Sequence, residues 1–137
     1  MLSFSINQGS LVAEKIYTVL ILCTGNSCRS QMAEVLLNHD LAGQVRALSA
    51  GTRPQPKVAD GAIAALQEAG LNTDGLYPKD IDAVLNEPID LVVTVCDNAK
   101  ETCPIFPLES FLAVRDDIRA RLVATVRETF GLQVAVA

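Results

Sequence analysis

One eight-residue segment constrains this chain more than any other. Residues 23–30 read Cys-Thr-Gly-Asn-Ser-Cys-Arg-Ser, directly after the apolar run Ile16–Leu22 and directly before the helix-forming stretch Gln31–Asn38. A continuous apolar run of this length is typical of a central strand in a parallel sheet, so the segment predicts a loop between a buried strand and a helix. Such a loop directs several backbone N–H groups and the positive end of the helix into one small concavity.

The residues of this loop suit the binding of a tetrahedral oxyanion and a nucleophilic attack on it. Arg29 can add a bidentate, charge-assisted contact to the anion. The same positive field favours the thiolate of Cys23, which makes Cys23 the predicted nucleophile. The alternative is that Cys23 is a small buried apolar residue and that Arg29 is solvated on the helix. The predicted oxyanion-binding residues are Thr24, Gly25, Asn26, Ser27, Cys28, Arg29 and Ser30.

Length and charge argue against several other classes of function. The chain has 137 residues, of which 50% are apolar, so we expect a flexible extension over residues 1–15 and one globular domain over residues 16–137. A net charge of −5 argues against nucleic acid and against an anionic membrane as partners. No apolar run approaches the ~20 residues of a membrane span. Residues 1–15 lack the ordered features of a signal peptide, so we expect a cytoplasmic protein.

The four cysteines favour catalysis or metal binding over structural disulfides, because disulfides are rare in cytoplasmic proteins. They form two spaced pairs, Cys23-x4-Cys28 and Cys96-x6-Cys103. No Cys-x2-Cys pair is present and His39 is the only histidine, so a zinc site would have to recruit the nucleophile itself. We therefore expect no metal that catalysis requires and no tightly bound cofactor.

Apolar periodicity predicts an α/β fold, with elements in the order strand, helix, strand, helix, short helix, strand, loop and long helix. This order implies right-handed crossovers and a three-layer sandwich, in which a small parallel sheet of three to four strands has helices on both faces. Cys23, Ser49 and Cys96 each lie at the carboxyl end of a predicted strand, where ligands bind in such folds, so we expect them to converge. The predicted strands are Ile16–Leu22, Val45–Leu48 and Ile89–Val95; the predicted helices are Gln31–Asn38, Asp60–Glu68 with Gly70 as its C-cap, a short helix that starts at Asp80 or Asp82 and ends near Leu85, and Glu109–Phe130 closed by Gly131.

From Cys23 to Glu34 the sequence reads Cys-Thr-Gly-Asn-Ser-Cys-Arg-Ser-Gln-Met-Ala-Glu and resembles the arsenate reductases built on the low-molecular-weight tyrosine phosphatase fold, in their thioredoxin-coupled form. The Cys-x5-Arg-Ser element alone does not separate reductases from phosphatases, whereas the hydrolases have no need of the Cys96-x6-Cys103 pair. The resemblance therefore implies a phosphatase-I-like fold and the reduction of arsenate to arsenite. It covers roughly Ile16 to Phe130 and includes residues 49–52, 59–70, 92–99, 103–107 and 114–118.

The resemblance also implies roles for the cysteines. Cys23 is the nucleophile, Cys96 is the first resolving thiol, and Cys103 delivers the resulting disulfide to thioredoxin. Glutaredoxin or mycothiol-type donors serve related proteins, so the electron donor stays open at this point. The alternative is that Cys96 and Cys103 are ordinary buried thiols. Cys28 is interpreted as a residue that supports the loop, and a part in the relay is the less favoured alternative.

Supporting roles follow from the same resemblance. Asn26 is similar to a loop asparagine that holds the loop in shape through a network with Ser49. In some family members a potassium ion lies near the equivalents of Asn26, Glu34 and Ser49, and the alternative for Glu34 is a solvated helix residue. Ser30 is expected either to donate a hydrogen bond to the Cys23 thiolate or simply to start the helix.

The chain departs from the family pattern after Pro107. Family members continue with a further strand and a loop whose aspartate acts as general acid, whereas here Pro107 leads directly into the last helix and about twenty residues are missing. Three explanations compete. Glu109, Asp97 or water supplies the proton; the chain is an oxyanion-binding or redox module with weak turnover; or residues 132–137, which alternate like a strand, refill the vacated sheet edge rather than fray.

Loss of the acid loop weighs more heavily on a phosphatase than on a reductase. A tyrosyl leaving group and the later attack of water both need proton transfer, whereas arsenate loses an oxygen that is readily protonated and then undergoes thiol exchange. We therefore favour arsenate reductase over a low-molecular-weight protein tyrosine phosphatase and over a non-catalytic sensor of arsenate or phosphate. The expected partners are arsenate or phosphate as the oxyanion and thioredoxin as the electron donor.

Overall fold

Three parallel strands form the centre of the molecule. The computed structural model describes residues 15–95 and 107–132. Within the sheet, Cys23 pairs with Gly51 and Leu22 pairs with Thr94. The carboxyl ends of the described strands therefore meet at one edge, as the sequence predicted. The strands are β1 (Tyr17–Cys23), β2 (Val45–Gly51) and β3 (Leu91–Thr94), in the order β2-β1-β3.

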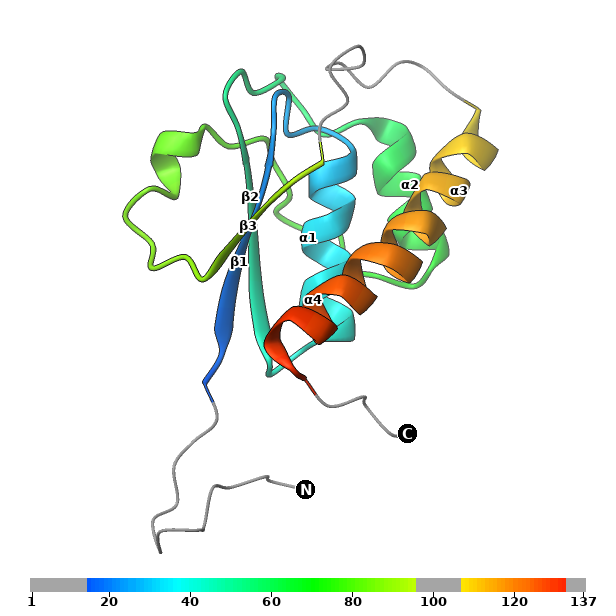
Figure 1. The fold of residues 1–137 in the computed structure, drawn as a ribbon. Helices are drawn as coiled ribbons and strands as arrows, with labels where there is room; N and C mark the ends of the chain where they lie inside the picture. The colour runs from blue at the N-terminus through cyan, green and yellow to red at the C-terminus, as the bar shows by residue number, and fades with distance from the viewer. Residues whose placement is uncertain (1–14, 96–106, 133–137) are drawn as a thin grey trace, which may run out of the picture.

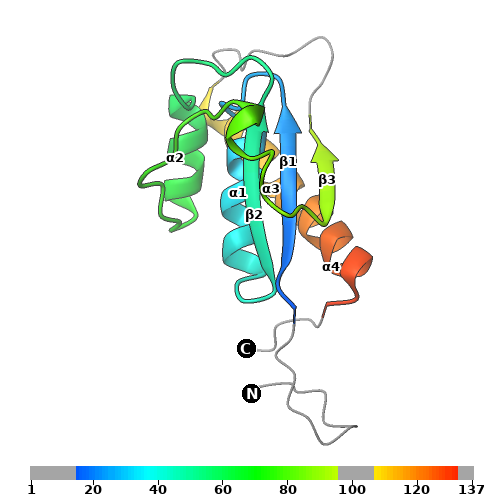
Figure 2. The same cartoon turned by 90° about the vertical axis from the view of Figure 1, so that its left-hand side faces the viewer.

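The described α-helices cover one face of this sheet (Figure 1). α1 lies against the sheet, and α2 and α3 pack on the other side of α1. The opposite face carries the short 3-10 helix η1 (Ile81–Ala83) and the segments that flank it (Figure 2). The predicted α/β class, a parallel sheet covered on both faces, is confirmed. α-Helices cover one face, and the 3-10 helix η1 with its flanking segments covers the other. The helices on the first face are α1 (Arg29–Asp40), α2 (Asp60–Glu68), α3 (Leu108–Ile118) and α4 (Ala124–Phe130).

β1 is buried on both of its faces, which explains its continuous apolar run. Val19 and Ile21 are fully buried in one cluster together with Val126 of α4. Leu20, between them, belongs to a second cluster that includes Val84, next to η1. Both faces of the central strand are therefore inside the protein, and the loop after Cys23 starts from a rigid element.

The last helix was predicted as one element, Glu109–Phe130, and the structure divides it. α3 runs into one π-helical turn, η2 (Arg119–Val123), and α4 follows. The Arg119 guanidinium, at the start of this turn, donates two hydrogen bonds of 2.7 Å to the Asp40 carboxylate at the end of α1. Gly131 then ends α4 with a left-handed backbone (φ 63°), as predicted.

α2 approaches α3 at a glycine. A Cβ atom at Gly61 would lie 2.2 Å from the ring of Phe111, which is buried between the two helices. Only glycine leaves room for this ring, so Gly61 sets how closely α2 packs on α3.

The other predicted elements are confirmed, most of them with shifted ends. The helix at Asp60–Glu68 has its predicted bounds, and the Asp80 carboxylate caps η1 by accepting from the Asp82 N–H (2.9 Å). None of the described helices is both long and apolar enough to cross a bilayer. Three predicted features lie outside the described residues. They are the N-terminal extension up to Glu14, the C-terminal tail from Gln133, and the segment 96–106, which contains Asp97, Cys96 and Cys103.

Candidate active site

The loop between β1 and α1 is held by hydrogen bonds to its carbonyl oxygens. Four of these bonds come from backbone N–H groups in the segment 52–59, which follows β2. The loop backbone is therefore fixed with these carbonyl groups turned toward that segment, an orientation that suits a loop presenting N–H groups to an anion elsewhere. The bonds run from Thr52 to Cys23 (3.2 Å), from Arg53 to Thr24 (2.9 Å), from Gln55 to Gly25 (2.9 Å) and from Ala59 to Ser27 (2.8 Å).

Gly51 lets the end of β2 approach this loop closely. A Cβ atom at Gly51 would lie 2.4 Å from the Thr24 carbonyl oxygen and 3.1 Å from the Asn26 Cβ. The first of these neighbours is backbone, which has no side-chain rotamer to change. The sequence prediction ended this strand at Leu48 and placed Ser49 at its carboxyl end, whereas pairing with β1 extends β2 to Gly51. The prediction therefore did not reveal this contact.

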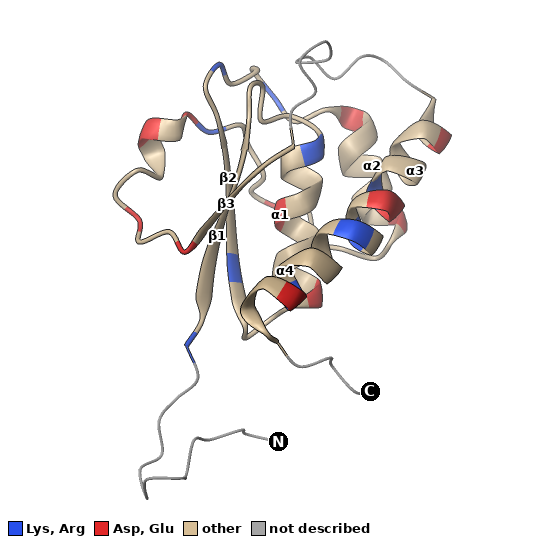
Figure 3. Ribbon diagram, viewed as in Figure 1, with Lys and Arg blue, Asp and Glu red and all other residues tan. Residues whose placement is uncertain are grey.

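Cys23 and Arg29 flank the loop as predicted. Cys23 is the last residue of β1, partly exposed, with a free thiol. Arg29 is the first residue of α1, whose first turn contains no acidic residue. Within the described ranges no carboxylate forms an ion pair with Arg29, so its positive charge and that of the helix N-terminus reinforce each other. Figure 3 shows a basic segment at the start of α1, and acidic and basic segments on the other described helices.

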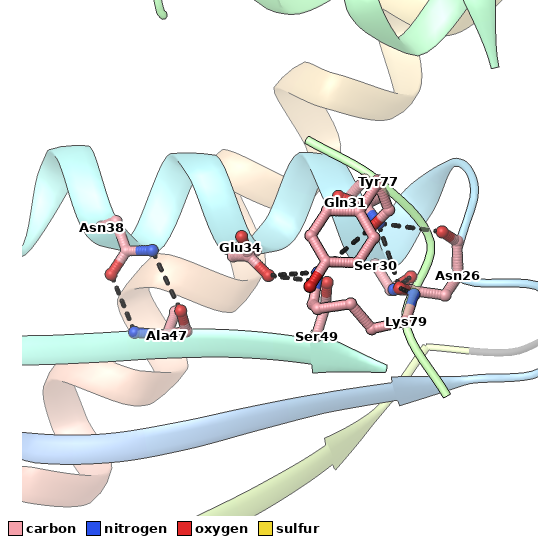
Figure 4. Close-up of polar contacts among 9 residues, drawn as sticks. All are labelled: Asn26, Ser30, Gln31, Glu34, Asn38, Ala47, Ser49, Tyr77 and Lys79. Carbon is pink, nitrogen blue, oxygen red and sulfur yellow. Dashed lines mark hydrogen bonds and ion pairs between the residues drawn. The ribbon is translucent and has the colours of Figure 1, made fainter. Parts of the chain in front are cut away.

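Asn26 holds the loop in an unusual conformation. Its backbone is left-handed (φ 49°), which asparagine tolerates better than most residues, and its side chain is fully buried. Its Nδ2 donates to the Ser30 Oγ (2.9 Å), and its Oδ1 accepts from the Lys79 N–H (2.7 Å) (Figure 4). The sequence interpretation placed Asn26 in a network with Ser49, and the structure links the two residues through Lys79 and Glu34.

Gln31 adds a further connection that sequence reasoning missed. Its buried Nε2 donates to both the backbone oxygen (2.9 Å) and the Oδ1 (3.0 Å) of Asn26, and to the Tyr77 oxygen (2.9 Å). The first turn of α1 is thereby tied to the loop and to the segment before η1. No sequence pattern distinguished Gln31 as a site residue, because it reads only as a polar residue beside the apolar Met32.

Ser30 and Cys28 occupy the start of α1. Ser30 is fully buried, and its Oγ accepts a hydrogen bond from Asn26, so its hydroxyl hydrogen remains available as a donor. Cys28 is the N-cap residue and packs partly buried against the cluster between α1 and α2. Cys28 also forms a disulfide. A disulfide at this position fits a part in the relay as well as support of the loop, so the interpretation of Cys28 as a supporting residue stays a prediction.

Glu34 and Ser49 lie behind the loop, and Lys79 joins them. The Ser49 Oγ donates to the Glu34 Oε1 (2.7 Å), and the Lys79 Nζ lies 3.6 Å from the same oxygen. The side chains of Lys79 and Glu34 are only 14% and 16% exposed, so the alternative of a solvated Glu34 is wrong. Lys79 was not a predicted site residue.

The distal cysteines, Cys96 and Cys103, lie outside the described residues, but the strand that leads toward them is described. The Val95 N–H donates to the Leu22 oxygen (3.2 Å), directly before Cys23. The chain therefore leaves β3 beside the nucleophile. Among the described residues no cluster of His, Cys, Asp and Glu side chains is suited to hold a metal ion.

Comparisons with known proteins match this geometry to one family. The model of the low molecular weight phosphotyrosine protein phosphatase family matches residues 18–122. The arsenate reductase of Brevibacillus brevis is 34% identical over 122 residues, a match that covers 77% of this chain and 90% of that protein. The match spans 122 residues but only about 105 residues of this chain, which is 77% of 137. The relative therefore has about 17 more residues in the matched region, which agrees with the roughly twenty residues predicted to be missing after Pro107.

Two solved structures with this fold are also arsenate reductases. One, an arsenate reductase in the phosphate binding state, has a TM-score of 0.67 and 26% identity, with 81% of this chain and 99% of that chain covered. The other is the thioredoxin-dependent arsenate reductase of Corynebacterium glutamicum, with a TM-score of 0.65 and 25% identity. That match covers 86% of this chain and 65% of the other.

Proposed function

The chain belongs to the low molecular weight phosphotyrosine protein phosphatase family, and we propose that within this family it is an arsenate reductase. The similarity to the Brevibacillus brevis arsenate reductase carries the proposal, because it extends over most of both proteins. The loop geometry supports it: Cys23, with a free thiol, ends β1 before the loop, and Arg29, which forms no ion pair with the described carboxylates, starts α1 after it. The Cys96-x6-Cys103 pair favours reduction over ester hydrolysis, since a hydrolase does not use it.

The proposed first step is the binding of arsenate by the loop. Arg29 and the N–H groups at the start of α1 hold the oxyanion, and phosphate would bind in the same way because both anions are tetrahedral. The Cys23 thiolate attacks arsenic, a sulfur–arsenic bond forms, and one arsenate oxygen leaves as water after protonation. The Ser30 hydroxyl stabilises the Cys23 thiolate before the attack on arsenic and again when Cys103 displaces it from the Cys23–Cys96 disulfide.

The proposed second step is a reduction by thiol exchange. The Cys96 thiolate attacks the Cys23 sulfur, the sulfur–arsenic bond breaks, and its electron pair stays on arsenic. Arsenic(V) thereby becomes arsenic(III) and leaves as arsenite, while two thiols become a disulfide. Cys103 then attacks Cys96, releases the Cys23 thiolate and moves the disulfide to the Cys96–Cys103 pair. A thioredoxin-type dithiol supplies the two electrons that restore the thiols.

The test is an assay that couples arsenate reduction to thioredoxin, thioredoxin reductase and NADPH. We expect arsenate-dependent NADPH oxidation by the wild type and its loss in Cys103→Ser. The Cys23→Ser variant should also lose turnover but retain phosphate binding, measured by calorimetry, because the backbone and Arg29 bind the anion.

Two outcomes would contradict the proposal. Hydrolysis of an aryl phosphate that is unchanged in Cys103→Ser, without arsenate reduction, would identify a phosphatase. Phosphate or arsenate binding with no turnover of either kind would identify a sensor.

Mass mapping of the oxidised protein provides an independent check, since the relay requires a Cys96–Cys103 disulfide.

A further inference from the structure

The loop between β1 and α1, residues 23–30, is called the anion loop. We infer that Lys79 supplies the positive charge that a potassium ion would otherwise supply next to Glu34, and that Lys79 positions Asn26 in the anion loop. The inference rests on the proposed function only in treating residues 24–30 as an anion site. It makes Lys79 a positioning residue, because it acts through Asn26 and Glu34 rather than on the substrate.

The ammonium group of Lys79 lies where a cation near Glu34 would bind. Its Nζ is 3.6 Å from the Glu34 Oε1 and 3.2 Å from the Tyr77 carbonyl oxygen, and 5.0 Å from the centre of the Tyr77 ring (Figure 4). A carboxylate, a carbonyl oxygen and the face of an aromatic ring are all groups that attract a cation. The side chain is 14% exposed, so this charge is held largely inside the protein.

A potassium ion does not fit beside this ammonium group. Both cations would share the Glu34 carboxylate, and their mutual repulsion would be strong at a largely buried position. The second predicted ligand is also in use, because the Asn26 Oδ1 already accepts hydrogen bonds from Gln31 (3.0 Å) and from the Lys79 N–H (2.7 Å). The residues predicted to bind potassium are therefore organised around Lys79.

The backbone of Lys79 connects the same group of residues to the loop. Its N–H donates to Asn26, whose left-handed backbone shapes the loop, and its carbonyl oxygen accepts from the Gly51 N–H (2.8 Å). One residue thus joins the end of β2, the loop and, through its side chain, Glu34 of α1. Without the ammonium group, the largely buried Glu34 carboxylate would keep its hydrogen bond from Ser49 but lose its counter-charge, which is unfavourable for both folding and the binding of an anion nearby.

The test measures phosphate affinity by calorimetry and thermal stability by circular dichroism, in KCl, NaCl and choline chloride at equal ionic strength. The wild type should give the same values in all three salts. Lys79→Met, which keeps most of the apolar stem, should bind phosphate about five- to tenfold more weakly, as expected for an uncompensated charge near a partly buried site. Lys57→Met is the matched control, because Lys57 is 74% exposed in an i,i+3 pair with Asp60, and it should behave as the wild type.

A double variant keeps the inference testable if Lys79→Met folds poorly. Lys79→Met with Glu34→Gln removes both charges, and it should recover stability relative to Lys79→Met alone. A gain of wild-type stability or phosphate affinity that is specific to KCl would overturn the inference, as would unchanged phosphate affinity in Lys79→Met. Salt-independent phosphate binding without arsenate turnover would instead defeat only the proposed function.

Discussion

Substitution of Gly51 by alanine should disturb the anion loop more than it disturbs the fold. Gly51 pairs with Cys23 at the end of the sheet, and an alanine Cβ would lie 2.4 Å from the Thr24 carbonyl oxygen. Real Cβ contacts stay above 3.0 Å, so one of the two backbones has to move. β2 is fixed by its ladder to β1, which leaves the loop as the part that shifts.

The cost follows from overpacking. Insertion of a methyl group into a well-packed site costs about 1–3 kcal/mol. The reduced freedom of the unfolded chain returns about 0.4–1 kcal/mol, so we expect a net loss of about 1–2 kcal/mol in the free energy of unfolding. Because the N–H groups proposed to bind the anion move with the loop, phosphate affinity should fall by roughly tenfold or more, as is usual when preorganised donors are displaced.

The assay combines urea unfolding, followed by circular dichroism because the chain has no Trp, with calorimetric titration of phosphate. Gly43→Ala is the control: its φ of +82° makes alanine strained, but no atom lies within 4 Å of the new Cβ. It should lose about 1 kcal/mol of stability and keep its phosphate affinity. Unchanged affinity in Gly51→Ala, or an equal loss in Gly43→Ala, would refute the reasoning.

Two further predictions concern the packing of the helices. Gly61→Ala should reduce the free energy of unfolding by about 1–3 kcal/mol, because its Cβ would enter the Phe111 ring, and Phe111→Leu in the same chain should restore part of the loss in urea unfolding. Hydrogen bonds from Arg119, with a smaller contribution from His39, hold the pKa of Asp40 below its ordinary value of 3.8 against the opposing effect of burial. A carboxyl with a depressed pKa stabilises the fold above its unfolded pKa and loses that contribution as the pH falls through its folded pKa. The stability difference between wild type and Asp40→Asn should therefore be largest near neutral pH and shrink below about pH 4.

The strand, loop and helix around Cys23 were predictable because each carries a local signal. The apolar run of β1 reflects burial on both faces, and the positive-φ glycines Gly70 and Gly131 mark helix ends. The π-helical turn at Arg119 could not be predicted, because the contact that accompanies it is with Asp40 on another helix. The boundaries of the strands shifted for a similar reason, since pairing with neighbouring strands decides where each one ends.

The supporting residues of the site were harder to predict than the loop itself. Lys79 is 53 residues from Asn26 in the chain, and no local pattern distinguishes it from a surface lysine. Its role depends on the burial of Glu34, which the sequence left open between a site residue and a solvated one. The role of such a charged residue can be recognised only from the structure, in which the fold places it next to its partner.

The short connection before α3 bears on which reaction the loop supports. The relative from Brevibacillus brevis has about 17 more residues in the matched region than the roughly 105 of this chain. If the general acid is among them, hydrolysis of an ester with a poor leaving group suffers most, because the departing oxygen needs a proton. Arsenate reduction depends less on such a group: the departing oxygen is readily protonated by water, and the steps that follow are thiol exchanges. The same anion loop in the same fold can therefore retain reductase chemistry where hydrolysis is impaired, provided that a second thiol reaches the Cys23 sulfur. The chain leaves β3 beside Cys23, since the Val95 N–H donates a hydrogen bond to the carbonyl oxygen of Leu22. The next residue in the chain, Cys96, carries the thiol that the relay requires.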